Sequence, residues 1–152
     1  MKKLLAVVLT FALLASLSVT AFAANTTGGD ADITTSIDPT YTVTIPADVN
    51  VQFNATETAF GTIEVTASQI HPDKCIKVAL ATDKELNNAI DNTKVIPYAI
   101  KDSEGAAFTS ATYLTEGDKT ELSIHITADD WNAAYAGDYS DTVTFTVSYE
   151  DK

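Results

Sequence analysis

Short runs in which apolar and polar residues alternate are the feature of this sequence that most constrains its fold. In the first run Tyr41, Val43 and Ile45 alternate with threonines, and residues 143–149 repeat the same pattern. A period of two places successive side chains on opposite faces of a β-strand, so that one face is buried and the other is wet. On this pattern we expect strands at 41–45, 49–53, 63–65, 76–80, 96–100, 122–126 and 143–149.

The connections between these runs are short and rich in turn-forming residues. Glycines beside acidic residues mark several of them, among them Gly117 and Gly137. No amphipathic segment is long enough for a crossover helix. The one helical candidate is 130–135, which Asp129 would cap and Gly137 would end. For residues 38–152 these patterns therefore predict an all-β fold, namely a single antiparallel β-sandwich with Greek-key connections and an immunoglobulin-like architecture.

Residues 1–23 have the three parts of a secretory signal peptide. Lys2 and Lys3 precede an apolar run at 4–15, and Ala21-Phe22-Ala23 supplies an A-x-A cleavage site. The alternative is a membrane anchor, but the apolar run is shorter than the roughly 20 residues that span a bilayer. We therefore expect an exported protein, secreted or held at the cell surface by contact, with no stable membrane insertion after cleavage.

The segment at 24–37 differs from the rest of the mature chain. Its first part is polar and contains two glycines, and 32–37 is a weak β segment whose large apolar residues are Ile33 and Ile37. Such a segment is either the first strand of the sandwich or a flexible arm that adds to a neighbouring sheet. We keep both interpretations, and in the second Ile33 and Ile37 are the interaction residues.

The charge and the scarcity of metal-binding residues exclude several classes of function. The chain carries 21 acidic and 9 basic residues, a formal charge of −12, and every basic residue is lysine. Nucleic-acid binding depends on basic residues that neutralise phosphates, so we expect no nucleic-acid partner. Two histidines and the single Cys75 leave little for a zinc site, a disulfide framework or a thiol–imidazole catalyst. Cys75 is either buried in its strand, which we favour, or free for an intermolecular disulfide.

The stretch at 130–149 carries a pattern found in known bacterial proteins. Its Gly-x-Tyr-x-Asp-x-Val-x-x-x-Val core begins at Gly137 and ends at Val147. This core resembles the closing strand of spore-coat-protein-U-like and archaic pilin-type subunits. It is also similar to exported surface proteins of Gram-positive bacteria with immunoglobulin-like folds, whose opening strand resembles residues 41–46. The resemblance implies a small secreted β-sandwich that acts as a structural, adhesive or pilin-like subunit of the cell surface.

The same core has a physical explanation that needs no family. Gly137 permits a sharp turn where a Cβ would clash. Tyr139 is placed to pack at a Greek-key corner and to hydrogen-bond the nearby backbone, and Trp131 then anchors the corner from below. We therefore predict that Trp131, Gly137 and Tyr139 define the fold at this corner. The alternative is that Trp131, Tyr135 and Tyr139 form a platform on which a sugar stacks.

Four aspartates flank the same corner, namely Asp129, Asp130, Asp138 and Asp141. Clustered carboxylates suit calcium, because the ion takes six to eight oxygen ligands. Their spacing matches no defined calcium loop, and each aspartate also fits a helix cap or a solvated turn. We predict no cofactor other than this candidate calcium site. Paired carboxylates also serve glycoside hydrolases, but nothing distinguishes a catalytic aspartate here, and we predict no catalytic residues.

Together these features predict a secreted, non-enzymatic bacterial surface protein. Its partners would be other surface-protein subunits or further copies of itself. They would be joined by strand addition through the arm at 32–37 or through an edge such as 95–100, where Pro97 marks an edge position. The alternative is an extracellular carbohydrate-binding module whose ligand is a glycan.

Overall fold

The structure is a computed structural model that describes residues 30–152. The chain divides into two units, and residues 30–36 of the first are exposed and contain no strand or helix. The second unit, Ile37–Lys152, holds all the described elements. In chain order these are β1 Thr40–Thr44, β2 Glu57–Gln69, β3 Lys74–Ala81, β4 Glu85–Asn88, β5 Val95–Pro97, β6 Ala99–Asp102, β7 Ser110–Tyr113, β8 Lys119–His125, α2 Ala128–Ala133, β9 Tyr139–Ser140 and β10 Thr144–Asp151.

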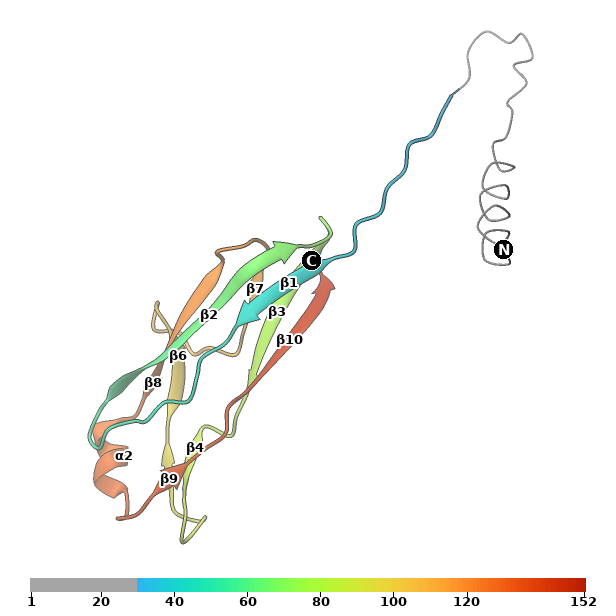
Figure 1. The fold of residues 1–152 in the computed structure, drawn as a ribbon. Helices are drawn as coiled ribbons and strands as arrows, with labels where there is room; N and C mark the ends of the chain where they lie inside the picture. Colours follow the sequence, from blue (N-terminus) through green and yellow to red (C-terminus); the bar gives the residue numbers. More distant parts are fainter. Residues whose placement is uncertain (1–29) are drawn as a thin grey trace, which may run out of the picture. The chain divides into compact units, whose positions relative to one another are not determined.

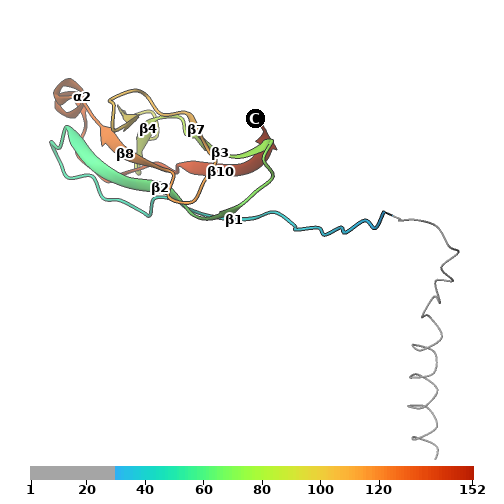
Figure 2. The ribbon, with the colours of Figure 1, turned by 90° about the horizontal axis from the view of Figure 1, so that it is seen from above.

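The strands form three antiparallel sheets. The first has the order β1-β2-β8-β6, the second β10-β3-β7 and the third β5-β4-β9. Figures 1 and 2 show β1 and β2 on one face of the sandwich and β3 and β10 on the other. Neighbours in a sheet are often far apart in sequence, because the chain crosses between the layers as in a Greek key. The predicted all-β sandwich is confirmed.

The core lies between the layers and takes the apolar face of each alternating strand. The most completely buried side chains are branched aliphatic residues, and most of them come from strands: Ile63, Val65, Ile76, Val78, Ile96, Ile100 and Ile126. Burying one such side chain stabilises the fold by about 1.5–3 kcal/mol. Burial of one face of each strand therefore explains the alternation in the sequence.

Most of the predicted strands are confirmed, with three differences. The run at 96–100 divides at Tyr98 into β5 and β6, which belong to different sheets, and Pro97 lies in an edge strand as predicted. The strand predicted at 49–53 is wrong, because residues 45–56 are irregular. The segment 32–37 is not the first strand, since β1 begins at Thr40.

The chain leaves the first sheet at Pro46, which lies against Gly61 of β2. Gly61 has a φ of +135°, and a Cβ there would lie 3.1 Å from the Cβ of Pro46. β2 also carries a bulge between Ala59 and Gly61. Proline has no N–H to donate, so pairing with β2 ends at this point. The irregular segment closes with a turn in which the Ala55 N–H donates to the Gln52 carbonyl.

The predicted helix is α2, which begins and ends two residues earlier than expected. Thr127, and not Asp129, is its N-cap, because the Thr127 hydroxyl accepts the N–H of Asp130 at 3.1 Å. The C-cap is Ala134, so Gly137 does not end the helix. Gly137 instead shapes the turn before β9, with a φ of +144°.

The predictions on export, membrane and thiol have different outcomes. The signal peptide at 1–23 lies outside the described residues. Within residues 30–152 no helix is long and apolar enough to cross a membrane. Cys75 lies in β3 and is 4% exposed, which confirms that this cysteine is buried in a strand.

Candidate functional site

A groove opens between the irregular segment 45–51 and the segment 138–145, and apolar side chains form part of its lining. It consists of two cavities of about 520 and 1010 Å³. Val49, Val51 and Asp141 line both cavities, so we treat the two as one feature and name it the β10 groove. A groove of this size accommodates several side chains of an extended segment.

The walls of the β10 groove come from both layers of the sandwich. Phe60 of β2 and Ile124 of β8 belong to the first sheet, and Val143 and Phe145 belong to the chain that enters β10. The ring centroids of Phe60 and Phe145 are 5.9 Å apart. This aromatic pair links the two sheets beside the groove.

The apolar residues of the irregular segment form the rim of the groove. Val49 and Val51 line it although they belong to no strand. Ile45 and Val49 remain 45% and 38% exposed, as expected for side chains on an open rim. Phe53 extends the rim towards α2, where its ring meets that of Trp131 edge-on with centroids 5.6 Å apart. The alternation in this segment therefore marks a groove wall and not a strand.

One edge of β10 is unpaired where it borders the groove. β10 pairs with β3 along residues 144–151 and with no other strand of the described chain. Within residues 30–152, no backbone hydrogen bond joins the segment 45–56 to residues 138–151. The N–H and C=O groups on this edge are therefore free to pair with an added strand, the property that makes edge strands docking sites.

A polar cluster lies where the two cavities meet. The hydroxyl of Tyr98, a residue that is 8% exposed, donates to Asp141 Oδ2. The Thr82 hydroxyl donates to the same oxygen at 2.6 Å, and the N–H of Thr142 donates to Oδ1, also at 2.6 Å. These three hydrogen bonds hold the carboxylate in place beside apolar side chains of the groove.

The hydrogen bonds favour the ionised form of Asp141. Burial raises the pKa of a carboxyl, but the hydroxyls of Thr82 and Tyr98 and the N–H of Thr142 outweigh it and hold the pKa of Asp141 below its ordinary value. Tyr98 shows the complementary effect, because burial and then the hydrogen bond to Asp141 raise the pKa of its hydroxyl. The groove therefore contains a fixed negative charge at neutral pH.

The three corner residues lie together around the turn before β9. The Tyr139 hydroxyl donates to the Tyr135 carbonyl at 3.0 Å and accepts the N–H of the same residue at 3.1 Å. Trp131 Nε1 donates to a backbone carbonyl of the irregular segment at 2.9 Å. At Gly137 a Cβ would lie 2.7 Å from Asn88 Nδ2. Because Trp131 and Tyr139 pack against the core, these contacts shape the fold and leave Tyr135 as the exposed ring of the predicted sugar platform.

The four aspartates of the predicted calcium site are not brought together. No group of three or more His, Cys, Asp or Glu side chains among residues 30–152 could hold a metal ion. Asp129 and Asp130 lie in the first turn of α2, and Asp130 accepts the Thr127 hydroxyl at 2.5 Å. Asp138 accepts an N–H from the turn after β4 with its carbonyl at 2.9 Å, and Asp141 belongs to the polar cluster. The arrangement of these side chains gives the calcium prediction no support.

The two isoleucines of the predicted arm are exposed. Ile33 is 98% exposed and Ile37 is 63% exposed. In an extended chain Ile33, Thr35 and Ile37 would share one face, because side chains alternate with a period of two.

The edge predicted at 95–100 is covered only in its second half. The Ile100 carbonyl accepts the Phe108 N–H at 2.9 Å, and the Asp102 N–H donates to the Ala106 carbonyl at 3.0 Å. The loop at 106–108 thus covers the outer edge of β6, while β5 remains an edge strand of its own sheet. We take β10 as the better candidate for strand addition because its free edge borders the groove.

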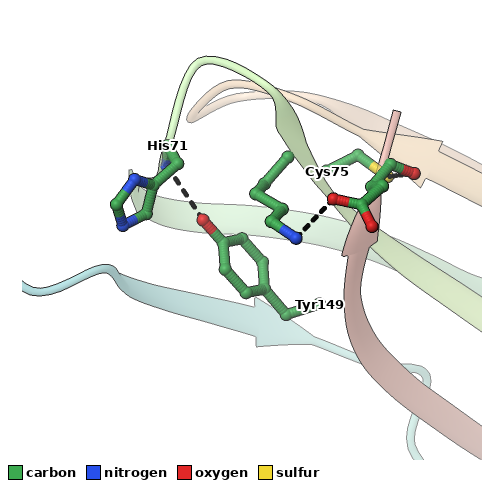
Figure 3. A network of polar contacts seen from close by, with 5 residues as sticks. His71, Cys75 and Tyr149 are labelled. Atoms are coloured by element: carbon green, nitrogen blue, oxygen red, sulfur yellow. Dashed lines mark hydrogen bonds and ion pairs between the residues drawn. The ribbon is translucent and has the colours of Figure 1, made fainter.

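Side-chain contacts hold the C-terminal end of β10 in place (Figure 3). The Tyr149 hydroxyl accepts the N–H of His71 at 2.9 Å, and Lys74 pairs with Asp151. Tyr41 of β1 stacks on Tyr149 with ring centroids 5.8 Å apart. These contacts join the edge strands of the two layers at one end of the sandwich.

Sequence reasoning singled out Asp141 but missed its partners. Thr82 and Tyr98 stand 59 and 43 positions away from Asp141 in the chain. The position of Tyr98 beside Pro97 indicated an edge strand, and no local pattern linked either hydroxyl to a carboxylate. Only the crossing of the chain between layers brings the three together.

Comparisons with known proteins identify no family for this chain. No family model matches it. No curated protein matches it either. Among solved structures, the chain is similar to one described as "Chaperone-tip adhesin complex is vital for synergistic activation of CFA/I fimbriae biogenesis", with a TM-score of 0.47 and 10% identity, over 71% of this chain and 42% of that one. The chain spans less than half of that protein, and a likeness at this level supports no functional conclusion.

Proposed function

We propose that this chain is a secreted, non-enzymatic bacterial surface protein whose β-sandwich accepts a strand from a neighbouring subunit along β10. The observation that supports this proposal is the unpaired edge of β10 beside a groove that apolar side chains partly line. The neighbour is another surface protein or a further copy of this chain, and the product is a structural or adhesive assembly. Export follows from the signal peptide predicted at 1–23.

An added strand would make two kinds of contact. Its main chain would hydrogen-bond to the free N–H and C=O groups of β10, which supplies affinity, and its alternate side chains would enter the groove, which fixes the register. Val51, Val143 and Phe145 would contact those side chains. Because the side-chain period is two, a slip of one residue would turn the apolar side chains away from the groove.

The polar side chains favour binding over catalysis. The Ser123 hydroxyl lies 2.9 Å from His125 Nε2, and Glu57 Oε1 lies 3.8 Å from the same nitrogen. A serine hydrolase needs its acid on the other ring nitrogen, where it orients the imidazole. Asp141 is also unsuited to be a general acid at neutral pH, because its hydrogen bonds hold its pKa below the ordinary value.

Hydrogen–deuterium exchange with added strand peptides tests the proposal. The mature chain from residue 24 is mixed with a short peptide that alternates valine with threonine, and the backbone amides of β10 are followed. We expect slower exchange at 143–149, because new hydrogen bonds protect the edge amides. A peptide of the same composition with its valines grouped at one end is the control and should give no protection. Unchanged exchange in β10 with every alternating peptide would contradict the proposal.

Light scattering on the mature chain tests whether its own arm is a donor. If the arm is a donor, self-association should increase with salt, because copies that each carry a strong negative charge repel one another. Replacing Ile33 and Ile37 by asparagine should then reduce the mass of the assembly, and the matched replacement of Thr34 and Ser36 should not. A run in millimolar Ca²⁺ tests the calcium prediction in the same experiment.

The wider cavity favours a second candidate function, an extracellular carbohydrate-binding module. Phe53, Trp131 and Tyr135 line this cavity together with the amides of Asn50 and Asn132. Aromatic rings with a few placed polar groups are typical of small-molecule sites. Tyr135 is 63% exposed, so Tyr135→Ala should keep the fold and reduce retention on immobilised glycans. Unchanged retention would contradict this second function.

A further inference from the structure

The residues that line the β10 groove include acidic side chains and no basic ones, and Lys94 Nζ lies 5.1 Å from the ring centroid of Tyr135 at the wider cavity. The acidic side chains are those of Asp48, Asp138 and Asp141. No ion pair within residues 30–152 includes Asp141. A carboxylate beside apolar walls attracts a cation more strongly than one in open water, because the local dielectric is lower.

Asp141 keeps an acceptor position for such a cation. An ionised carboxylate offers about four lone-pair positions. Thr82 and Tyr98 occupy Oδ2, and the N–H of Thr142 takes one position on Oδ1. One position on Oδ1 therefore accepts no N–H or hydroxyl donor among the described residues, although the Asp83 carboxyl lies close enough to interact with Asp141. Asp141 lines both cavities of the groove.

The arm of this chain is a poor match for that charge. It contains Asp30 and Asp32, is followed by Asp38, and includes no basic residue. No lysine occurs between Lys3 and Lys74. An added strand made from this arm would bring like charges towards a groove that is already acidic, and like-charge contacts oppose pairing.

We propose that the β10 groove selects a strand of a different protein, one that alternates apolar residues and carries a lysine whose ammonium group pairs with Asp141. This inference rests on the proposed function, because it specifies the donor of the added strand. The apolar stem of the lysine contacts Val49 and Val51, and its charged end reaches the carboxylate. Charge complementarity thus distinguishes the donor from further copies of this acidic chain.

Calorimetry with three peptides of equal length tests the charge selection on the mature chain. The first alternates valine with threonine and has lysine at one valine position; the second has norleucine there, and the third has glutamate. Each inward position is tried in turn. We expect the best lysine peptide to bind about tenfold more tightly than its norleucine match, with glutamate weakest. The lysine preference should largely disappear at 1 M NaCl, where the screening length is about 3 Å.

Asp141→Asn should remove the preference for lysine and leave the norleucine peptide bound within about twofold of its original affinity. Glu116→Gln is the matched control, because Glu116 is an exposed acidic residue outside the groove, and it should keep the full preference. Circular dichroism verifies that each variant is folded. If Asp141→Asn does not fold, the lysine, norleucine and glutamate peptides are compared on the unmodified chain. That comparison tests the charge selection, because only the peptide changes.

The outcomes separate this inference from the proposed function. Equal binding of the lysine and norleucine peptides would overturn the charge selection and leave strand addition standing. No binding and no protection of β10 by any alternating peptide would overturn strand addition and this inference with it. A peptide of residues 30–38 that binds as tightly as the lysine peptide would overturn the assignment of the donor to a different protein.

Discussion

The two ends of β10 are held in different ways. At its end, Tyr149 accepts a hydrogen bond from His71 and stacks on Tyr41, and the N–H of Lys152 donates to the Asp73 carbonyl at 3.1 Å. At its start, residues 141–145 face the segment 45–51 across the β10 groove without a backbone hydrogen bond between the two segments. Side-chain and backbone contacts thus hold the C-terminal end of β10, which we call its sealed end. The N-terminal end of β10 borders the groove and is its open end.

The two ends of β10 therefore have different roles: the sealed end packs within the fold, and the open end is available to bind a partner. The sealed end shows that side chains of this sequence can join β1 to β10 across the layers. The open end leaves apolar side chains and unpaired backbone groups on one edge, which in a soluble protein is an aggregation hazard unless another segment covers it. An open end beside a sealed one is the arrangement expected of a strand that receives a partner. Four substitutions test this comparison, from the largest expected effect on stability to the smallest.

Gly137→Ala should cost about 3 kcal/mol of unfolding free energy, measured by urea denaturation. The residue has a φ of +144°, and its new Cβ would lie 2.7 Å from Asn88 Nδ2. Asn88 is 5% exposed, and its Oδ1 accepts the N–H groups of Ile90 and Asp91, so its side chain cannot move without losing these bonds. The turn that places the start of β10 would be strained.

Gly105→Ala is the control for this substitution. Gly105 has a φ of +82° but nothing within 4 Å of an added Cβ, so only the backbone strain of about 1 kcal/mol remains. Equal losses for the two variants would show that the contact with Asn88 does not matter.

Asp141→Asn should cost about 2 kcal/mol at neutral pH, because hydrogen bonds to a charged acceptor become bonds to a neutral one. The folded-state pKa of Asp141 lies below its ordinary value of 3.8, so its stabilising effect is complete above that value and is lost as the pH falls through the folded-state pKa. Unfolding of both proteins between pH 7 and pH 2 checks this. The difference between them should narrow in acid, and a constant difference would contradict the role of the charge.

Tyr149→Phe should cost about 1 kcal/mol by thermal unfolding, because the N–H of His71 loses its acceptor at the sealed end. Tyr41→Phe is the matched control. It keeps the stacked pair, and the Tyr41 hydroxyl bonds to no residue among 30–152, so its effect should stay within about 0.5 kcal/mol. A larger loss from Tyr41→Phe than from Tyr149→Phe would contradict the role assigned to the Tyr149 hydroxyl.

The sequence predicts this fold well wherever the cause is local. Leu122 and Ile124 alternate with polar residues because one face of β8 is buried, and that cause is visible in any short window. Val49 and Val51 alternate in the same way but line a groove, because Pro46 packs on Gly61 and ends the pairing with β2. That contact joins two segments, so no local pattern distinguishes the two cases.

The site was less predictable than the fold. Asp141 stood out as one acidic residue of a corner, and the prediction for it was calcium. Its hydrogen bonds to Thr82 and Tyr98 come from distant parts of the chain, and the free edge of β10 depends on which strands do not pair. The bounds of α2 illustrate a smaller difficulty, since Thr127 and Asp129 are both good N-cap residues and only the observed hydrogen bond chooses between them.

Val51→Phe should change the stability by no more than about 0.5 kcal/mol and should abolish binding of the alternating peptides. Val51 lines both cavities, so the added ring enters space that a donor side chain would take. Urea denaturation and peptide titration on the same sample check both parts, and Leu114→Phe, at an exposed site outside the groove, should change neither. If the groove were a packing defect, filling it would stabilise the fold by about 1–2 kcal/mol. If the groove were closed in solution, the larger side chain would cost about 1–3 kcal/mol. Unchanged stability with lost binding is the result that only an open, receiving edge explains, and it would distinguish the start of β10 from its sealed end.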